Sequence, residues 1–156
     1  MLEVDIPGRG SYRLVNLVLD FNGTMALDGV LLDGVAERLK ALARVLEVTI
    51  ATADTFGTAG AVEASTGLRV LRMEPGREDA QKLSLVERLG KEQTICIGNG
   101  ANDVLMLRES ALGICIIGSE GASAQALAAG DMVFSEINAA LDALLNPRRL
   151  VAGLRK

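Results

Sequence analysis

Short apolar runs alternate along the chain with longer segments whose apolar residues recur at a helical period. Such runs predict strands that are buried on both faces of a sheet, as in parallel sheets covered by helices. The predicted strands are 13–20, 47–54, 69–73, 94–99, 112–118 and 131–135, and the predicted helices are 34–46, 58–67, 78–90, 101–110, 121–130 and 136–145. This alternation predicts an α/β fold: a Rossmann-like, doubly wound, mainly parallel sheet of about six strands with helices on both faces, a three-layer sandwich.

Residues with strong positional preferences mark several element ends. Asp33 and Ser135 are expected to cap the helices that follow them. An Asp-Gly pair within 26–30 predicts a tight hairpin, and the segment 2–7 predicts an added antiparallel strand. Pro147 is expected to stop the last helix and leave a solvated basic tail.

Length and composition restrict the class of protein. The 156 residues suit a single domain, 1–156, and 49% hydrophobic with 23% charged residues is typical of a folded globular chain. No apolar run approaches the roughly 18 residues of a membrane span, and the N-terminus does not resemble a signal peptide, so we expect a cytoplasmic protein. Aromatic residues make up only 3% and the net charge is −4, which argues against nucleic acid as a partner.

The sequence also limits the catalytic groups. Cys96 and Cys115 lie in apolar runs and are expected to be buried structural thiols without a disulfide. The chain has no histidine, which excludes Ser-His-Asp and Cys-His catalysis. Carboxylates, lysines, amides, hydroxyls and a bound metal remain as candidates for chemistry.

Polar residues gather at the ends of the predicted strands. Functional groups of doubly wound sheets collect at this carboxyl edge, so we expect these side chains to meet. They are Asp20 after the first strand, Thr52 and Asp54 after the second, Asn99, Asn102 and Asp103 after the fourth, and Lys82 on the helix before the fourth.

This set of side chains suits phosphoryl transfer. Asp20 can attack phosphorus and carry the group as an acyl phosphate. Thr52 and Lys82 can hold the phosphoryl oxygens, whose charge has to be stabilised in the transition state. Asp20 and Asp103 together can bind Mg²⁺.

The motifs resemble those of a known superfamily. The segment DFNGT at 20–24 resembles motif one of the haloacid dehalogenase superfamily, Asp-x-Asp-x-Thr, and the Asp-Lys-Thr-Gly-Thr of P-type ATPases. Thr52 in IATAD and Lys82 are similarly placed to the second and third motifs, and GNGANDVLML at 98–107 resembles the ATPases' Gly-Asp-Gly-x-Asn-Asp-x-x-x-Leu. The likeness covers roughly residues 13–136 and is greatest to the small soluble P-type-ATPase-like proteins of this superfamily.

The resemblance implies a Mg²⁺-dependent phosphatase or phosphotransferase and a role for each matching residue. By position, the implied catalytic residues are Asp20 as nucleophile, Asn22, Thr52 and Lys82; the implied phosphate-binding residues are Thr24, Thr52, Ala53, Lys82 and Asn102; and the implied metal ligands are Asp20, Asn22 through its carbonyl, Asn99 and Asp103.

The chain departs from the family pattern at two positions. Asn22 stands where phosphatases of the family have the acid–base aspartate, and Asn99 stands where an aspartate is usual. An amide cannot donate and recover a proton at neutral pH, and acid–base catalysis contributes about 10²- to 10⁴-fold in rate. Slow turnover or a long-lived aspartyl phosphate is therefore expected.

Structural roles are the alternatives for each of these residues. Asp20 alone would suggest a turn residue, Lys82 a solvated helix lysine, and Asp103 a first-turn acid. Asp54 is expected to cap the helix after the second strand, and Asp131 to be structural.

The motif spacing bears on the substrate. Between Thr24 and Thr52 lie 27 residues, and between Thr52 and Lys82 lie 29, too few for an inserted cap domain of about 50 residues. An open site implies a large phosphorylated partner, or a small substrate in a homo-oligomer whose neighbour covers the site through the apolar hairpin. A catalytically impaired phospho-ligand-binding module is the first alternative function, and a response-regulator receiver the second.

Overall fold

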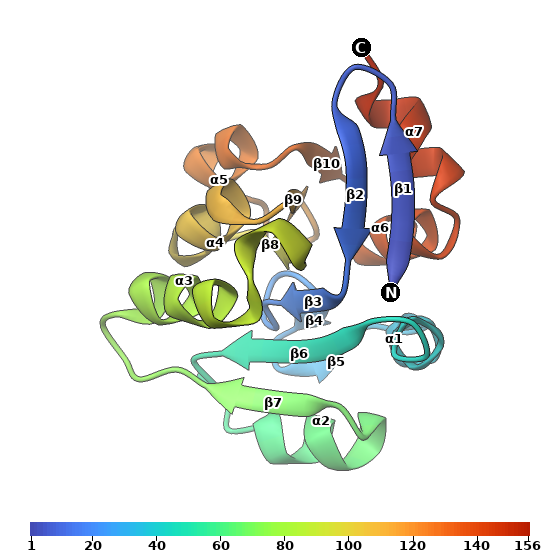
Figure 1. Cartoon of the computed structure of the whole chain (residues 1–156). Helices are drawn as coiled ribbons and strands as arrows, with labels where there is room; N and C mark the ends of the chain where they lie inside the picture. Colours follow the sequence, from blue (N-terminus) through green and yellow to red (C-terminus); the bar gives the residue numbers. More distant parts are fainter.

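The fold is built on a central six-stranded parallel sheet, shown in Figure 1. The computed structural model describes all 156 residues. Across the sheet the strands are β10 (Met132–Phe134), β9 (Leu112–Ile116), β8 (Thr94–Gly98), β3 (Asn16–Leu19), β6 (Glu47–Thr52) and β7 (Arg69–Arg72). Every pairing is parallel, which confirms the predicted sheet, and β10 and β7 lie at its two edges.

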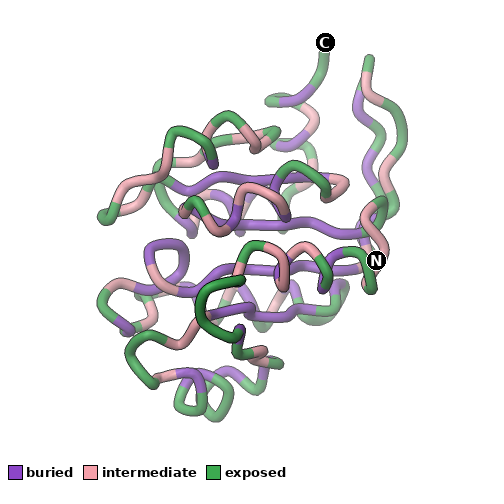
Figure 2. The backbone as a smooth tube through the Cα atoms, turned by 90° about the vertical axis from the view of Figure 1, so that its left-hand side faces the viewer, coloured by how far each residue is buried: buried purple, intermediate pink, exposed green.

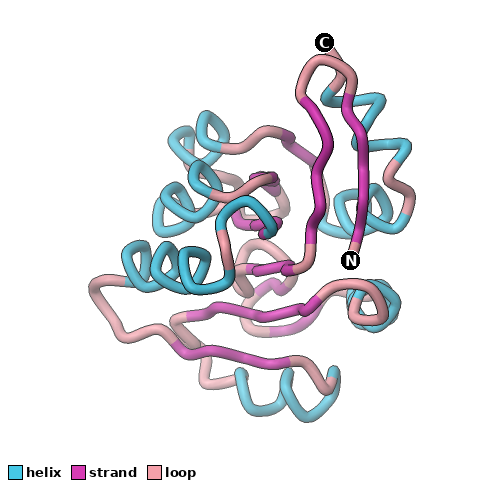
Figure 3. Tube along the Cα trace, viewed as in Figure 1, coloured by secondary structure: helices cyan, strands magenta, loops and turns pink.

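Helices cover both faces of this sheet, as Figure 3 shows. One face carries α3 (Glu78–Leu89), α4 (Val104–Glu109) and α5 (Ala124–Ala129); the other carries α1 (Val35–Leu42), α2 (Ala59–Thr66), α6 (Ile137–Leu145) and α7 (Arg148–Leu154). Short 3-10 turns, η1 (Lys91–Gln93) and η2 (Ala101–Asp103), precede β8 and α4. The predicted three-layer sandwich without a cap is therefore confirmed.

Alternation along the strands divides the core into two layers. In β3, Leu17 and Leu19 pack under α1 and α6, whereas Val18 packs under α3 and α4, because successive side chains of a strand point to opposite faces. Cys96 and Cys115 lie in the second layer as free, buried thiols, as predicted. The buried trace in Figure 2 follows the sheet strands through the centre of the molecule.

The prediction of one continuous strand over 13–20 is wrong. The segment divides at Val15 into β2 (Gly10–Leu14) and β3, and β2 pairs with β1 (Leu2–Ile6) in a separate antiparallel hairpin. The main-chain groups of Val15 bond instead to Gln93 and Glu47 at the start of the neighbouring strands. The apolar run is continuous because both pieces are buried, although in different sheets.

The hairpin predicted within 26–30 is confirmed. β4 (Ala26–Leu27) pairs antiparallel with β5 (Val30–Leu31). Asp28 and Gly29 form the turn with φ of 50° and 79°, the left-handed conformations that Asp-Gly hairpin turns require.

Two predicted helix caps and the predicted tail are wrong. Asp33 does not cap α1, whose N-cap is Gly34 in a left-handed conformation, and α6 begins after Glu136 without a side-chain cap from Ser135. The C-terminal residues form α7, whose Leu150 and Leu154 are buried against the core. Tertiary burial of these leucines overrides the basic, tail-like composition. No helix is both long and apolar enough to span a membrane.

The strand order places a switch point at the centre of the sheet. After β3 the chain builds outward through β6 and β7, and then crosses to the other side of β3 for β8, β9 and β10. Loops at the carboxyl ends of β3 and β8 therefore diverge and leave a crevice, the usual ligand position in doubly wound sheets.

Candidate active site

Three charged side chains from three elements meet at this crevice. Lys82 Nζ, from α3, lies 2.7 Å from Asp20 Oδ1 and 2.7 Å from Asp103 Oδ1. Lys82 and Asp103 are completely buried, and the Asp20 side chain is only 10% exposed. The alternative of a solvated Lys82 is therefore wrong, because its ammonium group bridges two buried carboxylates.

The electrostatics of this cluster are unbalanced. Burial, together with the negative charge of Asp103, raises the pKa of Asp20 to about 6, despite the opposing effect of Lys82. Burial alone would lower the pKa of Lys82, but the charges of Asp20 and Asp103 raise it above its ordinary value. Two carboxylates share one ammonium group, so the site has an excess of negative charge.

The β8–α4 loop holds Asp103 in a fixed orientation. Asp103 Oδ2 accepts hydrogen bonds from the backbone N–H groups of Asn99 and Gly100, each at 2.9 Å. A Cβ at Gly98 would lie 2.4 Å from Asp103 Cγ, so only glycine allows the side chain to fold back over β8. The loop thus presents the other carboxylate oxygen to Lys82.

Two buried threonines, Thr24 and Thr52, belong to the predicted site. The buried Thr24 hydroxyl lies 3.3 Å from Asp20 Oδ2 and 3.2 Å from Asn99 Oδ1. Thr52 Oγ1 accepts a hydrogen bond of 3.0 Å from the N–H of Asp54. Because Thr52 accepts there, its hydroxyl hydrogen is available to a ligand in the cavity.

A small cavity of about 240 Å³ opens above Asp20. Six of the predicted residues line it: Asp20, Asn22, Thr52, Ala53, Asn99 and Asn102. Lys82, Asp103 and Thr24 do not line this cavity; the first two are buried behind Asp20, and Thr24 lines an adjoining cavity of about 530 Å³. The cavity, which we call the phosphoryl cavity, is lined mostly by short polar side chains.

Asn22 is engaged by the hairpin. Its side-chain Oδ1 accepts a hydrogen bond of 3.1 Å from the backbone N–H of Gly29 at the tip of β4–β5. A Cβ at Gly29 would lie 2.8 Å from Phe56 Cβ, so this tip also touches the loop after β6. The Asn22 side chain therefore connects the loop after Asp20 to the hairpin.

The donor set fits a divalent cation. Asp20 and Asp103 supply two convergent carboxylates with excess negative charge, and Mg²⁺ in proteins is often bound by one or two carboxylates, water and substrate phosphate. The chain has no group of three or more His, Cys, Asp or Glu side chains arranged for a metal. Asn99 Oδ1 and the Asn22 carbonyl are the remaining predicted ligands.

Three lining residues, Thr55, Gly100 and Glu120, were not among the predicted site residues. Glu120 lies in the turn after β9, so the same reasoning about carboxyl ends of strands points to it. Asp54 Oδ1 accepts from the N–H of Ala59 at the start of α2, which confirms the predicted cap. A receiver would need an acidic pair on a strand that precedes Asp20, and the segment 2–7 offers Asp5 as the one candidate. Asp5 instead bonds to Ser11 in the separate β1–β2 hairpin, which contradicts the receiver alternative.

Sequence comparisons identify a close archaeal relative. The uncharacterized protein MJ0073 of Methanocaldococcus jannaschii is 46% identical over 92 residues, which cover 56% of this chain and 99% of that protein. The chain belongs to the family of this archaeal protein. A human phospholipid-transporting ATPase ID is 42% identical over 59 residues, 38% of this chain and 5% of the ATPase. No family model matches.

Solved structures share the architecture at low sequence identity. The 3-deoxy-D-manno-octulosonate 8-phosphate phosphatase of Moraxella catarrhalis, in complex with magnesium, phosphate and the sugar acid, has a TM-score of 0.69 and 15% identity, covering 89% of this chain and 90% of its own. The Yersinia pestis phosphatase has a TM-score of 0.67 and 15% identity, and the match covers 99% of this chain and 97% of its own. A cobalt-bound Haemophilus influenzae phosphatase has a TM-score of 0.67 and 14% identity, and the match covers 90% of this chain and 92% of its own. The fold is that of the haloacid dehalogenase superfamily, without a cap.

Proposed function

We propose that the chain is a Mg²⁺-dependent phosphohydrolase or phosphotransferase that works through an aspartyl phosphate on Asp20. The observation that carries this proposal is the buried Asp20–Lys82–Asp103 cluster at the switch point of the sheet. The structural relatives described as phosphatases, with magnesium and phosphate or with cobalt bound, support it.

Each residue has a defined task in this proposal. Asp20 Oδ attacks phosphorus, the bond to the leaving oxygen breaks, and the phosphoryl group is carried on the carboxylate. Lys82, Thr52 and the amide of Asn102 stabilise the phosphoryl oxygens, with Ala53 offering its backbone. Asp20, Asp103 and the oxygens of Asn22 and Asn99 would hold Mg²⁺, which supplies charge neutralisation at the phosphate when bound.

Turnover is proposed to be slow. The Asn22 amide has no proton to donate at neutral pH, and its oxygen is already bonded to Gly29. Leaving groups that depart without protonation, such as acyl phosphates, are therefore favoured over alkyl phosphate esters.

The substrate is a phosphorylated small molecule or macromolecule, and no nucleic-acid or membrane role is proposed. Val30 on the hairpin and Phe56 beside it are 69% and 52% exposed. A second copy of the chain bound there would cover the phosphoryl cavity, which favours a homo-oligomer for a small substrate. A cytoplasmic location is part of the same proposal.

A phospho-ligand-binding module without turnover is the second candidate. The bond from Gly29 to Asn22 favours it, because this position is used for structure. The two candidates differ in whether a covalent intermediate forms.

One experiment separates these candidates. The protein is incubated with Mg²⁺ and labelled acetyl phosphate, ATP or a panel of phosphate esters, and both phosphate release and acid-stable labelled protein are measured. The proposal expects signals that Asp20→Asn abolishes. If neither signal exceeds that of Asp20→Asn, the enzyme proposal is overturned and the binding module is favoured.

A further inference from the structure

The phosphoryl cavity is lined by two ionisable side chains, Asp20 and Glu120. Glu120 lies in the turn that connects β9 to α5, is exposed, and takes part in none of the ion pairs of the chain. It also lines the adjoining cavity beside Gly23 and Thr24, and no other residue lines both cavities. Its carboxylate is therefore free and faces the space beside the nucleophile.

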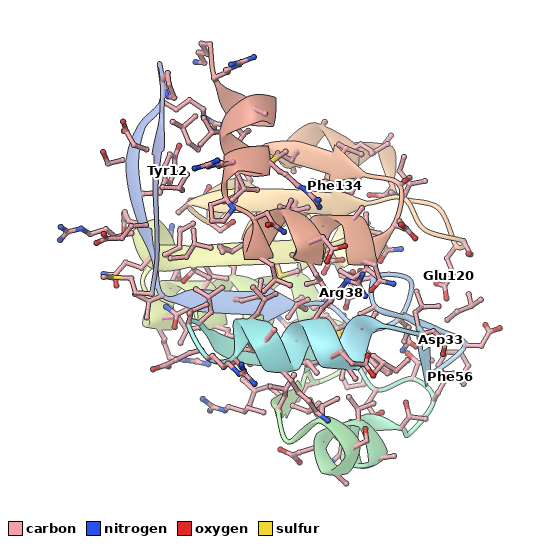
Figure 4. The ribbon with its side chains drawn as sticks, turned by 90° about the vertical axis from the view of Figure 1, so that its right-hand side faces the viewer. Tyr12, Asp33, Arg38, Phe56, Glu120 and Phe134 are labelled. Carbon is pink, nitrogen blue, oxygen red and sulfur yellow. The ribbon has the colours of Figure 1, made fainter.

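The nucleophile loop approaches Glu120 closely. A Cβ at Gly23 would lie 2.8 Å from Glu120 Oε2 and 2.5 Å from Asn99 Nδ2, and Gly23 has a φ of 78°. Glycine at this position lets the carboxylate rest against the loop three residues after Asp20. Figure 4 shows Glu120 on the same side of the molecule as Phe56, whose loop follows β6.

Hydrolysis of an aspartyl phosphate requires a group that accepts a proton from water. Asn22 cannot serve, because an amide is not a base at neutral pH and its oxygen is bonded to Gly29. Asp103 is buried, does not line the cavity, and is held by Lys82 and by two backbone N–H groups. The chain has no histidine, so Glu120 is the remaining carboxylate with access to water in this cavity.

We propose that Glu120 is the general base that hydrolyses the phosphorylated Asp20. The proposal rests on the proposed aspartyl-phosphate chemistry. A water molecule attacks phosphorus and gives its proton to the Glu120 carboxylate as the new O–P bond forms. The bond between phosphorus and Asp20 Oδ breaks, its electron pair restores the Asp20 carboxylate, and inorganic phosphate leaves. Glu120 then returns its proton to solvent.

The test follows the decay of labelled phosphoprotein after labelling with acetyl phosphate and Mg²⁺. Acetyl phosphate has a good leaving group, so formation of the intermediate does not need an acid. Glu120→Gln keeps the shape and the acceptor oxygen but is not a base, so we expect labelling to persist and decay to slow by about 10²-fold or more. Glu136→Gln is the matched control, because Glu136 lines only the adjoining cavity.

Two further measurements separate a base from a structural role. Hydroxylamine attacks the acyl carbon of an aspartyl phosphate without needing the protein's base, so the increase in decay rate that hydroxylamine causes should be equal in wild type and Glu120→Gln. Adding Asn22→Asp to Glu120→Gln should restore decay, because a carboxylate then returns to the cavity from the other side.

The outcomes are distinguishable. Equal decay in wild type and Glu120→Gln, with the label on Asp20, overturns the role of Glu120 and leaves the proposed function standing. A smaller hydroxylamine-dependent increase in decay rate in Glu120→Gln also overturns it, because the substitution would then have altered access. Absence of any Asp20-dependent label in the wild type overturns the proposed function itself.

Discussion

The two ends of the candidate site are built differently. At the phosphoryl end, Asp20, Lys82 and Asp103 come from separate elements, are buried, and are paired at 2.7 Å. At the open end, Glu120 is exposed, as are Asp28 and Val30 of the β4–β5 hairpin, and the Asn22 side chain is held by a single backbone hydrogen bond. Charge is concentrated and fixed at one end and is sparse at the other.

The proposed function accounts for this difference. Buried charges are stable only when they are paired and hydrogen-bonded, so a site that stabilises a phosphoryl group has to be organised in advance. The other end has to admit water and release products, which requires exposure. This organisation predicts large stability effects at the first end, and effects on rate or assembly at the second.

The largest effect is expected at Lys82. Lys82→Met leaves two buried carboxylates without a counter-charge, and removing one partner of a buried pair costs about 3–5 kcal/mol. Urea unfolding measures the change. Lys91→Met is the control, since Lys91 makes only partly exposed ion pairs and should change stability by less than about 1 kcal/mol. Similar losses of unfolding free energy in Lys82→Met and Lys91→Met would contradict the view that the buried end of the site depends on its paired charges.

A second large effect is expected from the charge of Asp20. Its pKa is raised from 3.8 to about 6 in the folded protein, so without metal the native state loses stability as the pH rises through this interval. Asp20→Asn should then be more stable than wild type at pH 8, by roughly 3 kcal/mol at most, with the difference disappearing below about pH 4.

Thermal unfolding across this pH range checks the sign of the stability difference between Asp20→Asn and wild type. Excess Mg²⁺ should raise the melting temperature of wild type more than that of Asp20→Asn, because the substitution removes a carboxylate ligand. A wild type that is more stable than Asp20→Asn at pH 8 without metal would contradict the unbalanced charge.

An intermediate effect is expected on the rate at Asn22. Asn22→Asp restores a proton donor and keeps the acceptor for Gly29, so steady-state phosphate release from alkyl phosphate esters should rise by about 10²-fold. Asn22→Ala, which loses the acceptor, is the comparison variant and should not raise turnover. If Asn22→Asp retains the fold and magnesium binding but shows no gain, the missing acid–base role does not belong to this position.

The smallest stability effect is expected on the hairpin. Val30→Glu replaces a 69% exposed side chain, so the unfolding free energy should change by no more than about 0.5 kcal/mol. Sedimentation velocity should show a shift toward monomer if the hairpin joins subunits. Oligomers of unchanged size would overturn the hairpin as the subunit contact.

The pattern of apolar and polar residues was sufficient to predict the strands of the sheet and most of the residues that line the phosphoryl cavity. The strand ends at Asp20, Thr52 and Asn99 were predicted from apolar runs, because burial on both faces of a parallel strand leaves a clear sequence signal. The split at Val15 left no such signal, since both halves of the run are buried in different sheets. Glu120 was missed because a glutamate in a glycine-rich turn is ordinary in sequence.

By itself, the sequence determined the order of strands and helices, the residues at the carboxyl edge, and the replacement of an acid by Asn22. The tertiary structure decided how those residues pair. The bridge from Lys82 to Asp20 joins positions 62 residues apart, and the burial that raises the pKa of Asp20 comes from surrounding elements rather than from its neighbours in sequence. Local periodicity reports which side of an element is buried, whereas the distance between two charges depends on how whole elements pack.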